Sequence, residues 1–90
     1  MRARWFCYLV ECADSTLYAG ITTSLPRRLT QHNRGLASKY TRSRRPVRLV
    51  YAESYRDRAA ASQREARIKR LPRASKRALA ATGRTRESQR

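Results

Sequence analysis

The feature that most constrains this chain is its charge. Of its 90 residues, 22 are Lys or Arg and only six are Asp or Glu, which gives a formal net charge of +16. Because like charges oppose compaction, so short a chain must gather its hydrophobic residues into one small core and leave most cations at the surface. The sequence therefore predicts a single domain with a polyanionic partner, and nucleic acid is the leading candidate.

Several other classes of protein are disfavoured. No run of about 18 apolar residues occurs, so a membrane-spanning helix is not expected. The apolar run over residues 5–10 is too short for the core of a signal peptide, and we expect a cytoplasmic protein. Cys7 and Cys12 have no metal-type spacing and are interpreted as thiols, and a single histidine forms no zinc cluster.

The hydrophobic pattern predicts the element order β-β-α-β-α-α. Residues 5–11 and 17–21 are rich in aromatic and β-branched side chains on either side of a turn at Asp14 and Ser15, which indicates an antiparallel hairpin. Helices are expected over residues 25–33, 58–71 and 73–81, and a third strand over 46–54. We therefore expect an α/β fold, a small three-stranded antiparallel sheet flanked by helices, over residues 1–82. Residues 83–90 are expected to form a basic, disordered tail.

Individual residues refine these elements. Thr22, Thr23 and Ser24 offer N-cap hydroxyls before Pro26, and Asp57 can cap the second helix. Gly35 is expected to end the first helix in the left-handed conformation. Gly20 within its strand indicates a bulge or a close approach of another group. In the third strand, simple alternation places Val47, Leu49 and Tyr51 on one face and Arg48, Val50 and Ala52 on the other. Residues 36–45 are expected to form a basic loop.

Four residues are candidates for chemistry by their positions. Tyr8 and Tyr18 belong to the two facing strands of the predicted hairpin, so they are expected to lie near one another. Arg28 and His32 lie four residues apart on one side of the first helix. Arginine matches the geometry of a phosphate, and histidine exchanges protons near neutral pH. The residue types alone leave simple alternatives open: strand packing for the tyrosines, and a solvated basic face for Arg28 and His32.

Glu65 is the one acidic residue between Arg58 and Arg86, a stretch with ten Lys and Arg residues. Helical spacing aligns it with Ala61 and Ile68, on the apolar side of the predicted helix. A carboxylate there can anchor a neighbouring arginine. It can also hold a hard cation such as Mg²⁺, which takes few carboxylates and obtains further contacts from water and phosphate. Spacing alone leaves both roles open.

These residues, taken in order, resemble a known family. Tyr8, then Tyr18-Ala19-Gly20, Arg28, His32 and finally Glu65 follow at spacings that are similar to those of the GIY-YIG nucleases, and in particular of small bacterial stand-alone members. Phe6, Cys7 and Ala19 replace the Gly and Ile residues of the family's two short motifs. The resemblance covers about residues 5–79.

The resemblance implies a divalent-metal-dependent endonuclease that hydrolyses DNA with weak sequence specificity, in DNA repair or processing. Glu65 would hold one Mg²⁺ or Mn²⁺ ion, Arg28 would bind the phosphate, and Tyr18 would contact the phosphate or water. Either Tyr8 or His32 would act as the base. Gly20 and Gly35 would serve structural roles. DNA is expected ahead of RNA, bound by a monomer or homodimer, and the flanking phosphates would meet cations of the first helix and the following loop: Arg27, Lys39, Arg42, Arg44 and Arg45.

Two alternatives stay open from the sequence. The first is a nucleic-acid-binding module of the same fold that does not catalyse. The second is a small basic interaction protein that docks on a larger assembly.

Overall fold

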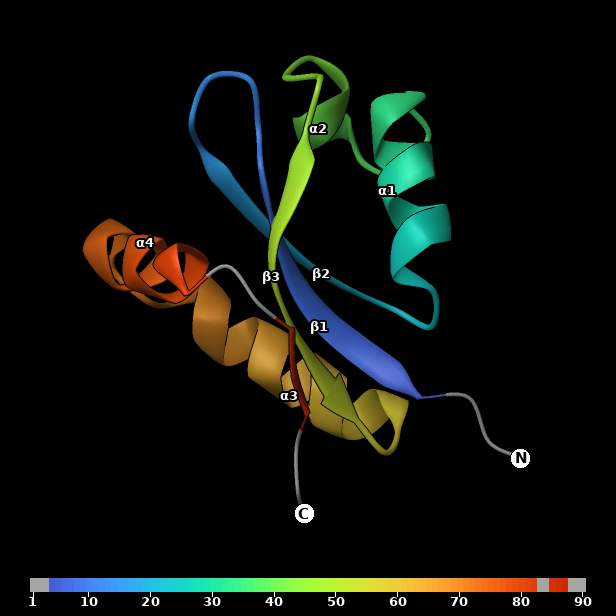
Figure 1. Ribbon diagram of the computed structural model, residues 1–90, viewed down its shortest axis with the longest axis vertical. Helices are drawn as coiled ribbons and strands as arrows, with labels where there is room; N and C mark the ends of the chain where they lie inside the picture. The colour runs from blue at the N-terminus through green and yellow to red at the C-terminus, as the bar shows by residue number, and fades with distance from the viewer. Residues whose placement is uncertain (1–3, 83–84, 88–90) are drawn as a thin grey trace.

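The computed structural model describes residues 4–82 and 85–87 (Figure 1). The elements follow along the chain as β1 (Trp5–Glu11), β2 (Leu17–Thr22), α1 (Leu25–Asn33), α2 (Lys39–Arg42), β3 (Arg48–Tyr55), α3 (Arg58–Lys69), α4 (Arg73–Ala81) and β4 (Thr85–Glu87). Within the described part of the chain, no helix has the length and apolar character needed to span a membrane.

The predicted three-stranded antiparallel sheet with flanking helices is confirmed. β1 pairs antiparallel with both β2 and β3, and helices α1 and α4 have the predicted bounds. The structure adds the four-residue helix α2 within the segment expected to be a loop, where Ser38 accepts a hydrogen bond from the Thr41 N–H at 3.1 Å. A serine N-cap three residues before the bonded amide is sufficient to start one helical turn.

The expectation of a disordered tail is wrong at three residues. Thr85–Glu87 form β4, which pairs in parallel with β3 and extends the sheet to the order β2-β1-β3-β4. This pairing gives partners to backbone groups that an edge strand otherwise leaves exposed. The other residues of the predicted tail, 83–84 and 88–90, lie outside the described part of the chain.

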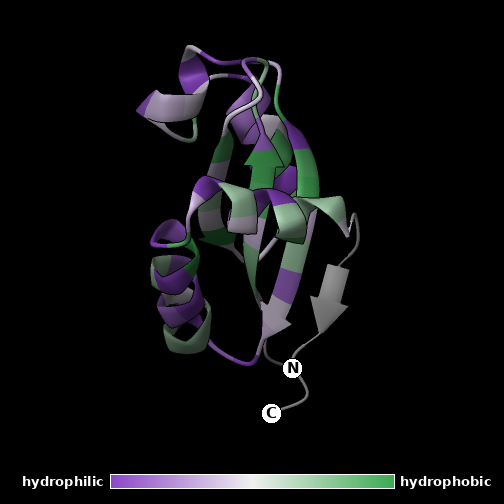
Figure 2. Ribbon diagram, turned by 90° about the vertical axis from the view of Figure 1, so that its left-hand side faces the viewer, coloured by the Kyte–Doolittle hydropathy of each residue, from purple (hydrophilic) through white to green (hydrophobic). Residues whose placement is uncertain are grey.

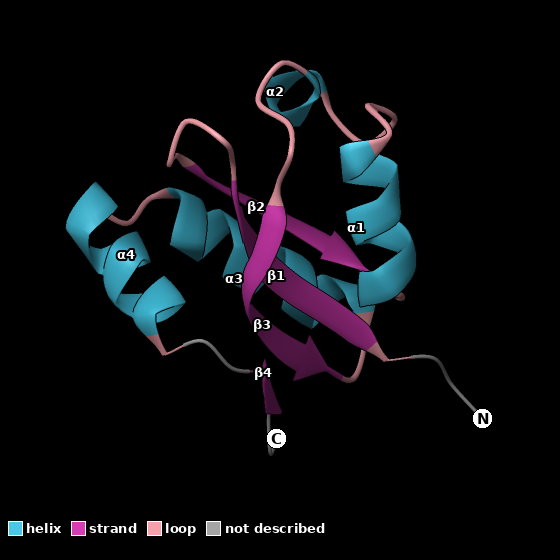
Figure 3. Ribbon diagram, turned by 45° about the horizontal axis from the view of Figure 1, so that its top comes forward, coloured by secondary structure: helices cyan, strands magenta, loops and turns pink. Residues whose placement is uncertain are grey.

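The sheet separates two small cores. On one face, Cys7, Leu9 and Ile68 belong to a cluster that also packs against α4. On the opposite face, Tyr8 and Val10 belong to a cluster that packs against α1. Figure 3 shows α3 crossing behind the strands with α4 beside it, and Figure 2 shows the most hydrophobic stretches on the central strands. Alternation along β1 therefore sends Tyr8 toward α1 and its neighbours in sequence toward α3.

The predicted alternation of the third strand is wrong at its centre. The pairing of β1 with β3 shifts register between Leu9 and Val10, because Leu9 faces Tyr51 whereas Val10 faces Leu49. Val50 is thus an extra residue in β3, and it lies in the same core cluster as Tyr51 rather than on the opposite face. A β-bulge of this kind changes which side chains face each layer, and periodicity alone does not reveal it.

A buried carboxylate fixes α3 to the sheet. Glu53 of β3 accepts hydrogen bonds from Arg64 Nε at 2.9 Å, from Arg64 Nη2 at 3.1 Å and from the Tyr51 hydroxyl at 2.5 Å, and a further one from the Tyr55 hydroxyl. Burial by itself raises the pKa of Glu53, but the hydrogen bonds outweigh it and hold this pKa below its ordinary value. Arg64 precedes Glu65 in α3, so this pair also sets the position of that residue.

Replacing Glu53 with Gln should destabilise the fold at neutral pH. Since Arg64 would lose its carboxylate partner, we expect a loss of about 2 kcal/mol in the free energy of unfolding. The native pKa of Glu53 lies below that of the unfolded chain, so its contribution is present above the unfolded value and is lost as the pH falls. Urea unfolding at a series of pH values should therefore show the gap between wild type and Glu53→Gln narrowing below about pH 4.

The matched variant is Tyr55→Phe, which removes one hydrogen-bond donor and keeps the ion pair. It should cost about 1 kcal/mol. A gap between wild type and Glu53→Gln that stays constant down to acid pH would contradict this account.

Candidate active site

The hairpin of β1 and β2 places Tyr8 directly opposite Gly20. Tyr8 is only 2% exposed, and its ring lies over the glycine: a Cβ atom at Gly20 would lie 2.6 Å from Tyr8 Cζ. Any larger residue would collide with the ring. The glycine expected to allow a close approach therefore does so, because it makes room for the first candidate tyrosine.

The single histidine links this tyrosine to two helices. His32 of α1 is 1% exposed, and its Nε2 lies 2.8 Å from the Tyr8 hydroxyl. Its Nδ1 lies 2.8 Å from the hydroxyl of Thr41 in α2, which is itself buried and lies within reach of the Ser38 backbone carbonyl at 3.4 Å. Both ring nitrogens therefore have oxygen partners, from two different elements.

The state of the imidazole follows from its surroundings. Burial, assisted by the positive charge of Arg28, holds the pKa of His32 below its ordinary value, so the ring is neutral at pH 7. One arrangement of protons gives every one of these groups a partner: Nδ1–H of His32 donates to the Thr41 hydroxyl, Thr41 donates to the Ser38 carbonyl, and the Tyr8 hydroxyl donates to Nε2. Burial raises the pKa of Tyr8 far above its ordinary value, although Arg28 opposes this shift. Tyr8 is therefore a protonated phenol whose proton points at a basic nitrogen.

The second tyrosine joins the same cluster through its ring. Tyr18 meets the His32 ring edge-on at a centroid distance of 5.6 Å and stacks on Tyr40 at 5.6 Å. The guanidinium of Arg44 covers Tyr40 at 3.9 Å and pairs with Asp14 at 3.0 Å. A continuous row of contacts thus runs from the hairpin turn to His32, and Tyr18 is fixed within it.

Arg28 presents a positive charge at this cluster. Its side chain and those of Tyr8, Leu25 and Leu29 line one small hollow between α1 and the sheet. Among the residues that the structure describes, no carboxylate pairs with Arg28, and its buried Nε has no hydrogen-bond partner. A guanidinium whose donors are free is suited to an anionic oxygen.

Glu65 approaches from α3. Its side chain is 22% exposed and forms an ion pair with Lys69 at 3.3 Å, whereas Arg64, the neighbouring arginine, pairs with Glu53. Lys69, the partner of Glu65, connects this carboxylate to the strand that carries Tyr18. Lys69 also lies 5.8 Å from the Tyr18 ring centroid. The structure thus gathers Tyr8, Tyr18, Arg28 and His32 into one cluster, and it connects Glu65 to that cluster through Lys69.

The residues present fit a hard cation that is held by one carboxylate. Over residues 4–82, no group of three or more His, Cys, Asp or Glu side chains gathers as an all-protein site would require. Mg²⁺ often uses one or two carboxylates and completes its shell with water and substrate phosphates. The partly exposed carboxylate of Glu65, whose one ion pair in the described structure is with Lys69, matches that pattern.

The five predicted phosphate contacts do not lie in equivalent surroundings. Arg27, Lys39, Arg42 and Arg45 are exposed, and none of them pairs with a carboxylate in the part of the chain that the structure describes. Arg44 differs, because it is half-buried between Asp14 and Tyr40 and donates to the Tyr40 carbonyl at 2.8 Å. This geometry indicates that Arg44 positions Tyr40 and, through the stacked rings, Tyr18.

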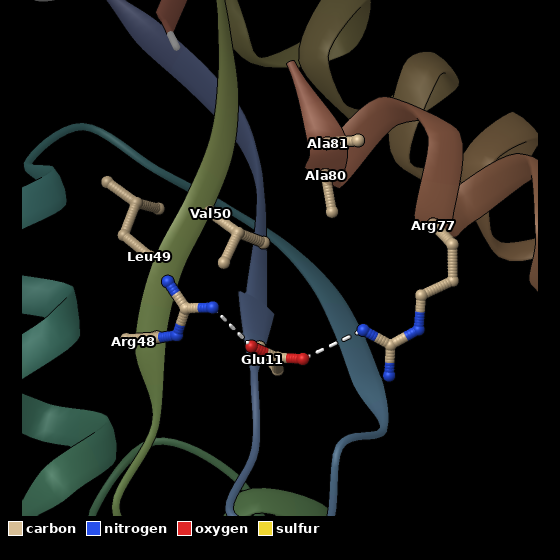
Figure 4. A pocket seen from close by; sticks show the side chains of 7 residues that line it. All are labelled: Glu11, Arg48, Leu49, Val50, Arg77, Ala80 and Ala81. Atoms are coloured by element: carbon tan, nitrogen blue, oxygen red, sulfur yellow. Dashed lines mark hydrogen bonds and ion pairs between the residues drawn. The ribbon is translucent and has the colours of Figure 1, made fainter. Parts of the chain in front are cut away.

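A separate hollow of about 360 Å³ lies between α4 and the ends of β1 and β3 (Figure 4). Glu11 reaches across it to Arg48 and Arg77, with a distance of 2.7 Å to each. None of the candidate catalytic residues lines this hollow. The Glu11–Arg77 pair ties α4, which buries no residue completely, to β1, and the Glu11–Arg48 pair joins β1 to β3.

Sequence reasoning did not single out Thr41 and Glu53. Thr41 holds one side of His32, and Glu53 holds the helix that carries Glu65. The serine and threonine of the string Ser38-Lys39-Tyr40-Thr41, three residues apart, were a usable sign of a helix cap. Glu53 gave no such sign, because its partners come from a separate helix and from its own strand.

The pKa of His32 should respond to Arg28 and not to the neighbouring Arg27. Since the positive charge of Arg28 contributes to the lowered pKa, Arg28→Met should raise it, while burial keeps it below the ordinary value. The matched variant is Arg27→Met, which removes an equal charge from an exposed position. Titration of the imidazole C–H resonances by NMR measures both, and equal shifts in the two variants would contradict the assignment.

Comparisons with known proteins identify the family to which the chain belongs. A sequence model described as the GIY-YIG catalytic domain matches residues 4–78. A UPF0213 protein of Desulfotalea psychrophila is 57% identical over 79 residues, which cover 87% of this chain and 72% of the relative. A UPF0213 protein of Natronomonas pharaonis is 48% identical over 81 residues, 90% of this chain and 95% of the relative.

Two solved structures share the fold. The solution NMR structure of a UPF0213 protein from Bacillus halodurans has a TM-score of 0.56 at 35% identity and covers 88% of this chain and 84% of its own. That of a protein from E. faecalis has a TM-score of 0.59 at 36% identity and covers 90% and 86%. The chain therefore belongs to the GIY-YIG family, within the group of small UPF0213 proteins found in bacteria and archaea.

Proposed function

We propose that this protein is a divalent-metal-dependent endonuclease that hydrolyses phosphodiester bonds in DNA. The observation that supports this most is the buried Tyr8–His32 hydrogen bond beside the unpartnered guanidinium Nε of Arg28. The carboxylate of Glu65 is connected to this cluster through Lys69. A proton acceptor, a phosphate ligand and a metal ligand are the parts that this hydrolysis needs.

Arg28 binds the scissile phosphate. Its donors meet the non-bridging oxygens, on which negative charge grows as the attacking oxygen adds. Tyr18, fixed by His32 and Tyr40, hydrogen-bonds the phosphate or the attacking water through its hydroxyl. Because Tyr18 is already held by its ring contacts, it needs little reorganisation when the substrate binds.

The proton of the attacking water leaves along the Tyr8–His32 hydrogen bond. With its pKa raised by burial, Tyr8 does not stand as a phenolate, so it accepts this proton only as it gives its own to His32 Nε2. The neutral imidazole becomes an imidazolium, stabilised through Nδ1–H by Thr41. Tyr8 is thus the contact with water, and His32 is the final acceptor.

Glu65 is the residue that would hold the Mg²⁺ or Mn²⁺ ion, one per site. When bound, the ion supplies polarisation of the phosphate and stabilisation of charge on the leaving oxygen. Lys69 now neutralises Glu65 and would give up this ion pair to the incoming cation.

The surface around the site favours nucleic acid without reading its sequence. Arg27, Lys39, Arg42 and Arg45 offer exposed charge to flanking phosphates, which gives salt-sensitive affinity and little discrimination between bases. DNA repair or processing in the cytoplasm is the setting that we expect for such an activity.

Glu65→Gln should abolish metal-dependent cleavage and leave the fold and the DNA affinity nearly intact. The ion pair with Lys69 is of the exposed i,i+4 kind, worth about 0.5 kcal/mol, so its loss does not unfold the chain. The assay follows nicking of labelled single-stranded, duplex, flap and branched DNA, and of RNA, with Mg²⁺ or Mn²⁺. Asp57→Ser, which removes one carboxylate but keeps the cap of α3, is the control.

Persistent cleavage in Glu65→Gln would refute the metal assignment. If the wild type binds DNA tightly and in a salt-dependent way but cleaves it with neither Mg²⁺ nor Mn²⁺, the protein is instead a nucleic-acid-binding module that does not catalyse.

Arg28→Ala should reduce kcat much more than it weakens binding, because Arg28 faces charge that develops in the transition state. We expect a loss of about 100-fold or more in kcat. Arg27→Ala removes the neighbouring exposed guanidinium and should change mainly the affinity. Equal losses in kcat and affinity for Arg28→Ala would make it one phosphate contact among many.

A further inference from the structure

A second basic hollow lies on the other side of β2 from Arg28. It has a volume of about 220 Å³, and its walls are Thr16 and Leu17 at the start of β2 and Arg73, Lys76 and Arg77 from α4. Three of these five residues are cationic. The hollow contains no residue of the predicted active site and no member of the basic set between Arg27 and Arg45.

The charges in this hollow are poorly compensated. Only Arg77 has a carboxylate partner, Glu11 at 2.7 Å, and Glu11 is shared with Arg48. In the part of the chain that the structure describes, neither Arg73 nor Lys76 forms an ion pair. Three cations around one small hollow repel each other, and an anion that enters between them removes this repulsion.

The hollow is close to the active site along the chain. Leu17 precedes Tyr18 in β2, and the two side chains point to opposite faces, as their separate core clusters show. In the described sheet β2 is an edge strand, with β1 as its one neighbour. Lys69, which lies 5.8 Å from the Tyr18 ring centroid, places a further cation beside that strand.

We propose that the hollow between α4 and the start of β2 binds a backbone phosphate of the nucleic acid whose scissile phosphate lies at Arg28. The backbone then passes across the edge of β2, with Lys69 beside its path. This rests on the proposed function for the position of the scissile phosphate. The chemistry of the two places identifies the ligand. Cations lie on both sides of β2, so the ligand is a polymer that carries several phosphates along its backbone.

The test is binding in the absence of divalent metal, so that its result does not depend on cleavage. The variant Arg73→Gln with Lys76→Gln removes two charges from the hollow. The control Arg56→Gln with Arg58→Gln removes two charges from exposed positions at the other end of α3. Fluorescence anisotropy of a labelled single-stranded DNA, titrated at several salt concentrations, gives the affinity and its salt dependence for each protein.

We expect the variant in α4 to bind the DNA roughly fivefold more weakly than the wild type. The slope of log affinity against log salt concentration should also decrease in magnitude by about 0.7, because one phosphate contact to single-stranded DNA contributes about that much. The control should leave the slope unchanged. Arg73→Lys with Lys76→Arg keeps both charges and should retain wild-type binding.

Equal effects of the α4 variant and the control, or an unchanged slope in the α4 variant, would overturn the proposal. Circular dichroism of each variant verifies the fold. If the wild type cleaves DNA and the α4 variant binds it as the wild type does, the hollow is not a phosphate site, and the proposed function is unaffected. The reverse result, in which the α4 variant loses affinity but the wild type cleaves nothing, would refute the nuclease and keep the phosphate site.

Discussion

The site depends on one buried imidazole. His32 connects β1, α1 and α2, because its two nitrogens contact the hydroxyls of Tyr8 and Thr41 and its ring faces Tyr18. A neutral ring with both nitrogens bonded is the state that satisfies these groups inside a small core, where unpaired polar atoms are costly. The same bonds give Tyr8 a route for its proton, so the contacts that order this part of the fold are also the contacts used in the proposed catalysis.

A second constraint places the opposite half of the site. The sheet divides the molecule into two cores, and Glu65 belongs to the helix on the face that Tyr8 does not point toward. The bonds between Glu53 and Arg64 attach that helix to β3 one residue before Glu65. Because β2 is the edge strand of the described sheet, the proposed function places the substrate phosphate at this edge, between Arg28 on one face and Glu65 on the other.

The distribution of charge follows from this arrangement. Five of the chain's six acidic residues lie where the structure describes side chains, and four of these, Glu11, Asp14, Glu53 and Glu65, pair with cations inside the fold. Most of the arginines whose side chains the structure describes have no carboxylate partner there, which favours binding of a polyanion. In this chain the rare carboxylates organise the structure, and the abundant cations are left free for a ligand.

The sequence by itself determined the order of strands and helices apart from α2 and β4, the bounds of α1 and α4, and the choice of candidate residues, because these depend on local periodicity, capping residues and spaced motifs. Only the tertiary structure decided the bulge at Val50, the addition of β4, the role of Thr41 and the separation of Arg44 from the free cations. Each of these depends on contacts between segments far apart in the chain. The tertiary structure also decided the protonation states of Tyr8 and His32, because burial shifts both pKa values and burial is a property of the assembled fold.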